Sequence, residues 1–114
     1  MTIHEMKLQP APFFSIRSGE KIIESRLYDE KRQQIQLGDR ILFRNIADLD
    51  DVITVQVDGL LRYPTFVAMF NDFDPVCFGG ASKEFLAEQI YTYSSKEDEA
   101  RYGVLGIRVS KIEV

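Results

Sequence analysis

We predict an α+β protein built on a small mixed β-barrel of five or six strands that is surrounded by short helices. The chain has 114 residues, 45% of them hydrophobic and 28% charged, which suits one globular domain over residues 1–114 with a single core. Segments rich in β-branched residues alternate with short helical segments. The connections are mostly too short for full crossover helices, which favours a mixed or closed sheet over a doubly wound parallel one. Closure also protects the edge strands.

In the first half of the chain we expect, in order, a strand over 2–8, a helix over 11–18, a strand over 20–28, a short helix over 29–34 and a strand over 40–44. Gly19 is placed to end the first helix, which begins near two prolines. The β-branched pair Ile22 and Ile23 favours the second strand. Asp29 can cap the short helix, and Gly38 followed by Asp39 is typical of a turn.

In the second half we expect a strand over 52–61, helices over 65–70 and from 82 to about 89–91, a last short helix, a strand over 104–109 and a further strand segment over 112–114. The alternation of Ile53, Val55 and Val57 with polar residues predicts the first of these strands. Ser94 and Glu97 have the capping-box spacing that announces the last helix. The acidic run 48–51 is expected at a solvated hairpin tip.

Composition excludes several classes of protein. No apolar run approaches the length of about 20 residues that a membrane helix needs, and the N-terminal residues lack the apolar stretch of a signal peptide, so we expect a cytoplasmic protein without a membrane partner. Cys77 is the only cysteine and His4 the only histidine. This pair cannot supply a zinc-ligand cluster or the usual catalytic triad, so we predict no metal and no cofactor. We expect His4 to be a hydrogen-bonded strand residue, and Phe13, Phe14, Phe43 and Phe66 to fill the core.

The charge is distributed unevenly. The net charge of −4 argues against bulk electrostatic binding to nucleic acid. Residues 1–46, however, carry eight Lys/Arg and six Asp/Glu, whereas residues 47–114 carry six basic and twelve acidic residues. The first half could therefore form a local basic patch on an acidic protein.

The segment SGEKIIESR, residues 18–26, embeds three charges among apolar residues: Lys21, Glu24 and Arg26. On a regular strand Glu24 and Arg26 share a face and can pair, whereas Lys21 would point to the opposite face. Gly19 permits an irregular start to the strand, so we predict that all three side chains line one concave surface. Two interpretations are open. One is an ion pair at the rim of the sheet with Lys21 in solvent; the other is a cleft that offers donors to an anion or a base edge.

The pattern G-x-K-x-x-E-x-R, formed by Gly19, Lys21, Glu24 and Arg26, resembles the signature of the ASCH domain family, a branch of the PUA-like superfamily. The Leu-Gly-Asp turn that follows and the ending YSSKEDEARYGVLGIRV are also similar to the family, so the resemblance spans nearly the whole chain. It implies a small β-barrel with helices packed around it and a cleft beside the signature. ASCH domains are proposed to bind RNA by analogy with PUA domains.

The resemblance also implies an enzymatic alternative. One bacterial branch of similar length hydrolyses N4-acetylcytidine, and ribonuclease activity has been attributed to another. Lys21 matches the lysine of the first branch, but Glu24 stands where that branch has a threonine. The loop over 77–82 has no acid for its catalytic glutamate.

Our leading hypothesis is therefore an RNA- or nucleotide-binding domain whose ligand lies between Lys21, Glu24 and Arg26, with Gly19 shaping the approach. Arg17 and Tyr28 are candidates for additional ligand contacts. The alternative is a small metal-independent hydrolase that acts on a modified nucleoside or on RNA, with Lys21 as base and Glu24 as its partner. The sequence leaves open which ligand is bound, whether the protein is catalytic, and its oligomeric state.

Overall fold

The structure is a computed structural model and describes residues 1–112. Its centre is a curved five-stranded sheet in the order β1-β3-β4-β5-β2. The strands are β1 (Ile3–Leu8), β2 (Ile23–Leu27), β3 (Arg40–Asn45), β4 (Asp48–Tyr63) and β5 (Val104–Lys111). β1 runs parallel to β3 and every other neighbouring pair is antiparallel, so the sheet is mixed. The predicted α+β class with a small barrel-like sheet is confirmed.

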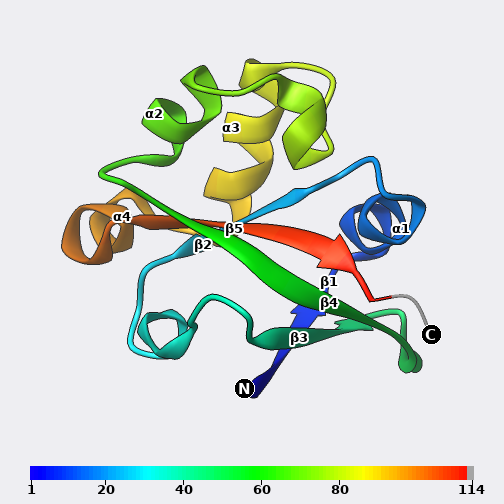
Figure 1. The fold of residues 1–114 in the computed structure, drawn as a ribbon. Coiled ribbons are helices and arrows are strands. Elements are labelled where there is room, and N and C mark those ends of the chain that lie inside the picture. Colours follow the sequence, from blue (N-terminus) through cyan, green and yellow to red (C-terminus); the bar gives the residue numbers. More distant parts are fainter. Residues whose placement is uncertain (113–114) are drawn as a thin grey trace.

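Short helices surround the sheet (Figure 1). They are α1 (Pro10–Ser18), α2 (Phe66–Asn71), α3 (Lys83–Tyr93) and α4 (Lys96–Tyr102), together with the 3-10 turns η1 (Arg32–Gln34) and η2 (Pro75–Phe78). In Figure 1, α2 and α3 lie together above the sheet, with α4 toward one side and α1 toward the other. Among residues 1–112, no helix is long and apolar enough to cross a bilayer.

The predicted helix boundaries follow from local chemistry, with one correction. Gly19 ends α1 in the left-handed region at φ 85° and donates its N–H to the carbonyl of Ile16. Ser82 begins α3 by accepting from the N–H of Phe85, as expected. The cap of α4 is Ser95, not Ser94, because Ser94 ends α3 and its N–H is already bonded to Ile90. The predicted start of this helix is therefore displaced by one residue.

Several strands differ in length from their predictions. β4 begins at Asp48 and the turn from β3 occupies residues 46–47, so the acidic run 48–51 starts a strand and is not the hairpin tip. β2 begins at Ile23 and not at residue 20, because the N–H groups of Lys21 and Ile22 donate to α1 and to η2, and only the carbonyl of Ile22 still accepts from β5. The expected strand segment over 112–114 falls mostly outside the described residues.

Apolar residues form two cores. The barrel core lies between α1 and the strands β1, β3, β4 and β5, and includes Phe13 and Phe43, both with no exposed surface. The cap core lies between β2, β5, α2, α3 and η2, and includes Phe66 and Phe70. Phe14 was predicted to be in the core but is 49% exposed, because it stands edge-on to Phe13 at the outer side of α1.

The two edge strands, β1 and β2, leave a seam that side chains bridge. No backbone ladder joins β1 to β2 within residues 1–112. Instead the Nη2 of Arg26 donates to the carbonyl of Lys7 at 2.9 Å, and the Nζ of Lys31 donates to the carbonyl of Glu5 at 2.7 Å. Cationic side chains therefore cover the outer edge of β1, which is a known way to protect an exposed strand edge. This seam positions the candidate site.

Candidate ligand-binding site

A buried ion triad lies at the start of β2. The Oε1 of Glu24 accepts from the Nζ of Lys21 at 2.7 Å, and its Oε2 accepts from the Nε of Arg26 at 2.8 Å. Glu24 and Arg26 share a face of β2, as their spacing predicts. Lys21 reaches the same carboxylate because it precedes the strand and its N–H is bonded to the carbonyl of Ser15 in α1. The predicted irregular start of this segment is confirmed.

The electrostatics of the triad keep the carboxylate ionised. Burial of Glu24, which is 3% exposed, would by itself raise its pKa. The charge of Lys21, then that of Arg26, and the hydrogen bonds from both outweigh burial and lower the pKa of Glu24 to about 2. The triad is therefore a fixed ionic cluster at neutral pH.

Lys21 lies beneath the loop that follows η2. The main-chain N–H of Ile22 donates to the carbonyl of Cys77, and Gly79 packs against the side chain of Lys21. Lys21 is 8% exposed, and with Gly19 it contributes to a small cavity of about 210 Å³ between α1, β4 and β5. The rest of that cavity is lined by Ile16, Ile22, Val55, Val109, Ser110 and Lys111.

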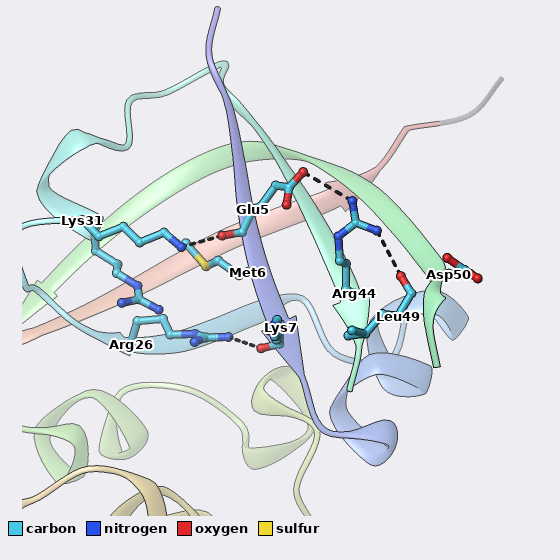
Figure 2. Close-up of a pocket in the computed structure, with 9 residues that line it drawn as sticks. Glu5, Met6, Lys7, Arg26, Lys31, Arg44, Leu49 and Asp50 are labelled. Carbon is cyan, nitrogen blue, oxygen red and sulfur yellow. Dashed lines mark hydrogen bonds and ion pairs between the residues drawn. The ribbon is translucent and has the colours of Figure 1, made fainter. Parts of the chain in front are cut away.

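A larger groove of about 590 Å³ follows the seam (Figure 2). Five basic and two acidic side chains line it together with two apolar ones: Lys7, Arg26, Lys31, Arg32, Arg44, Glu5, Asp50, Met6 and Leu49. Figure 2 shows Lys31 and Arg26 reaching β1 from one side and Arg44 from the other. All five cations come from residues 1–46, the part of the sequence with a basic excess. We name this cavity the seam groove.

Hydrogen bonds hold four of the five cations of the seam groove in place, those of Arg26, Lys31, Arg32 and Arg44. Besides the bonds of Arg26 and Lys31 to β1, Arg44 donates to the carbonyl of Leu49 at 3.0 Å and to Glu5 at 3.4 Å. The Nη1 of Arg32 donates to Asp29 at 2.9 Å. Burial and the neighbouring charge of Arg26 lower the pKa of Arg32 from its usual value. The groove is thus a preorganised set of donors suited to an anion.

The predicted site residues divide between two cavities. Gly19 and Lys21 line the small cavity, whereas Arg26 lines the seam groove, and the buried Glu24 connects them. The three charged side chains meet at the Glu24 carboxylate, whereas Lys21 and Arg26 line different cavities, so a single concave ligand surface stays a prediction.

Arg17 and Tyr28 line neither cavity. Arg17 pairs with Asp51 of β4 and its guanidinium stands 4.7 Å from the ring centroid of Phe13. Tyr28 packs against the barrel core, and the guanidinium of Arg62 covers its ring at 3.4 Å from the centroid. Both side chains are occupied by intramolecular contacts.

The sequence motifs did not identify four basic residues of the seam groove: Lys7, Lys31, Arg32 and Arg44. They are scattered over β1, the segment after β2, and β3, so no spacing motif joins them. The signal that could have found them is the basic excess of residues 1–46, which the sequence showed without indicating which side chains converge.

Several side chains with catalytic chemistry are engaged in intramolecular bonds. Within residues 1–112, no three His, Cys, Asp or Glu side chains converge as metal ligands. His4 is bonded to Asp39 at 2.9 Å, as a strand residue with a satisfied ring. The hydroxyl of Ser82 is engaged as a helix cap. The arrangement therefore offers hydrogen-bond donors for an anion more readily than a nucleophile.

Comparisons with known proteins agree with this architecture. The sequence model of the ASCH domain matches residues 6–113. The crystal structure of hypothetical protein PH0355 is 34% identical over 97% of this chain and 100% of that chain, with a TM-score of 0.86. The solution structure of PF0455 from Pyrococcus furiosus is 31% identical over 99% of this chain and 100% of that chain, with a TM-score of 0.78.

More distant structures share the fold. The crystal structure of ASCH from Zymomonas mobilis is 15% identical and has a TM-score of 0.65, with 96% of this chain and 68% of that chain covered. No curated protein sequence matches the chain. The family match over nearly all of the sequence and the two relatives above 30% identity lead to one conclusion: the chain belongs to the ASCH domain family.

Proposed function

We propose that the protein binds RNA or a nucleotide in the seam groove and holds it through phosphate contacts. The observation that carries this proposal is the set of five Lys/Arg side chains against two carboxylates in one groove of a protein whose net charge is −4. Phosphate contacts from Lys and Arg dominate the affinity of most nucleic-acid-binding proteins. Membership of the ASCH family, which is PUA-like and proposed to bind RNA, supports the same ligand class.

The size of the groove and its surroundings favour a short ligand. A volume of about 590 Å³ lies within the usual range of about 300–1,000 Å³ for small-ligand sites. The acidic remainder of the chain repels a long polyanion that extends beyond the groove. We therefore expect contacts to one or a few nucleotides, not to a long duplex.

In this proposal the buried triad positions Arg26. Glu24 holds the Nε of Arg26, and the carbonyl of Lys7 holds its Nη2. The guanidinium is thereby fixed in the groove wall with its Nη1 left for a ligand. Preorganisation of this kind lowers the entropy lost on binding.

The alternative of a metal-independent hydrolase with Lys21 as base has less support. The Nζ of Lys21 is bonded to Glu24, and the side chains of the two residues are 9% and 4% exposed. A general base at this position must reach the substrate, whereas the Nζ of Lys21 is held by the buried Glu24 carboxylate.

Fluorescence anisotropy with a labelled single-stranded RNA of about six nucleotides, with hydroxyl groups at both ends, tests the proposal. We expect Lys31→Ala and Arg44→Ala each to weaken binding about three- to tenfold, because each removes one phosphate contact. Arg101→Ala is the control, since Arg101 is an exposed residue of α4 outside the groove. Two or three phosphate contacts predict a slope of log Kobs against log[salt] of roughly −1.5 to −2. Absence of binding to the RNA and to free nucleotides at low salt would contradict the proposal.

A further inference from the structure

Arg32 has an unusual environment in the seam groove. It is the first residue of η1, and Asp29 fixes it twice: one carboxylate oxygen accepts from the main-chain N–H of Arg32 at 3.1 Å, and the other accepts from its Nη1 at 2.9 Å. The backbone and one corner of the guanidinium are therefore anchored. Because the guanidinium is planar and rigid, holding this corner also fixes the orientation of its opposite edge.

That opposite edge consists of Nε and Nη2. The Nε is buried, and no acceptor within residues 1–112 lies within hydrogen-bond distance of it. No bond from Nη2 to a described residue is present either. A buried donor without an acceptor is uncommon in proteins and destabilises the fold. The Nε–Nη2 edge is also the pair of parallel donors with which arginine binds an oxyanion in a bidentate manner.

Arg26 supplies a second guanidinium in the same groove. Its Nε and one N–H of Nη2 are bonded to Glu24 and to the carbonyl of Lys7, so both N–H groups of Nη1 and the second one of Nη2 remain as donors. The charge of Arg26 lies near enough to Arg32 to lower the pKa of Arg32. Two guanidiniums held close together repel each other, and an anion bound between them relieves the repulsion.

We infer that Arg32 and Arg26, with Lys31 at their side, form a subsite for the phosphate monoester at the end of a nucleotide or RNA ligand. This inference rests on the proposed function and adds to it the chemical form of the ligand. Arg32 offers its Nη2 and, when the ligand displaces the atoms that cover it, its buried Nε, while Arg26 offers its Nη1 and the Nζ of Lys31 retains donors beyond its bond to Glu5. A phosphodiester within a chain has one charge and two non-bridging oxygens, whereas a monoester has three such oxygens and nearly two charges at pH 7. The donor set matches the monoester.

The test compares three forms of one single-stranded RNA of about six nucleotides: with a 5′-phosphate, with a 3′-phosphate, and with hydroxyl groups at both ends. The dissociation constants are measured for the wild type, Arg32→Lys, Arg44→Lys and Arg101→Lys. We expect the wild type to prefer one phosphorylated end by about tenfold, which identifies the end that is recognised. Arg32→Lys keeps the positive charge but loses the two parallel donors, so we expect it to lose the preference. Arg44→Lys weakens all three RNAs equally and retains the preference, and Arg101→Lys changes nothing.

Inorganic phosphate provides a second measurement. It should displace the preferred RNA from the wild type at lower concentration than from Arg32→Lys, and thermal melting of both proteins confirms that the variant is folded. If Arg32→Lys does not fold, the end preference and phosphate competition of the wild type decide the question. Equal affinity of the wild type for the three RNAs, or an undiminished preference in folded Arg32→Lys, overturns this inference and leaves RNA binding in the groove intact. If neither the three RNAs nor free nucleotides bind, both this inference and the proposed function are overturned.

Discussion

Two buried glutamates, Glu24 in β2 and Glu99 in α4, differ in the groups that compensate the burial of their carboxylates. Both carboxylates are almost inaccessible, with 3% and 6% of the residue exposed. Glu24 is bonded to two cations, Lys21 and Arg26. Glu99 has no ion pair within residues 1–112; its Oε2 accepts from the N–H of Phe66 at 2.9 Å and from the hydroxyl of Tyr91 at 2.6 Å.

The difference separates the region of the proposed ligand site from a region where the carboxylate joins helices. Around Glu99 every bond joins helices to each other, because the carboxylate ties α4 to the first turn of α2 and to Tyr91 of α3. Around Glu24 the bonds position two cations, and Arg26 still has a donor for a ligand in the seam groove. A buried carboxylate with cationic partners can therefore organise a ligand site, whereas one with neutral partners organises packing.

The largest expected effect separates the two glutamates directly. Glu24→Gln leaves two cations, one of them buried, without their counter-charge, so we expect the free energy of unfolding to fall by about 3–5 kcal/mol. Glu99→Gln keeps an oxygen that can accept from both of its donors, so we expect a loss of about 1 kcal/mol or less. Denaturation by urea at pH 7 measures both. Equal losses of unfolding free energy in the two variants would contradict the view that the cationic partners of Glu24 make it the more costly residue to neutralise.

Acid should destabilise the protein through Glu24. Its folded-state pKa of about 2 is below its ordinary value of 4.5, so the carboxylate stabilises the fold above pH 4.5 and this contribution is lost as the pH falls toward 2. The difference corresponds to about 3 kcal/mol. Urea denaturation between pH 6 and pH 2 should show a steep decline in the wild type. A variant that lacks this carboxylate but still folds, such as Glu24→Gln, should show a shallower one; parallel declines contradict the assignment.

A smaller effect is expected at the second glutamate. Tyr91→Phe removes one of two donors to the Glu99 carboxylate, and we expect a loss of about 2 kcal/mol. Burial, followed by the bond to Glu99 and its charge, raises the pKa of Tyr91 to about 12. The stabilising contribution of this phenol is complete below pH 10 and is lost as the pH rises through about 12. Ultraviolet titration of the wild type against Tyr91→Phe measures that pKa, and a value near 10 contradicts the buried bond.

The smallest effect concerns the loop over Lys21. Gly19 and Gly79 both have left-handed backbone, at φ 85° and 82°, so alanine at either position is expected to cost about 1–2 kcal/mol. A Cβ at Gly19 meets nothing within 4 Å, whereas one at Gly79 stands 3.2 Å from the Cδ of Lys21. We therefore expect Gly79→Ala to lose a few tenths of a kcal/mol more than Gly19→Ala, because Lys21 must shift. Thermal melting compares them, and an equal loss indicates that Lys21 adapts freely.

Much of the fold could be predicted from local patterns. Alternation identified β4, proline and glycine marked both ends of α1, and the spacing of Glu24 and Arg26 placed them on one face. The wrong predictions concern the first residue of a helix or strand, at positions where two sequence patterns favour different residues. Two adjacent serines could each cap α4, and the β-branched pair at 22–23 suggested a strand that begins earlier than the hydrogen bonds allow.

The sequence by itself determined the elements, the family signature and the charge asymmetry, because each depends on residues that are close along the chain. Only the tertiary structure decided which cations converge. Lys7 and Arg44 lie on neighbouring strands, and Arg26 and Lys31 reach them because the sheet curves until β1 and β2 face each other across a seam. The closing of that seam depends on long-range packing of the barrel core, so no local pattern could show that Glu24 would separate Lys21 from the groove while fixing Arg26 within it.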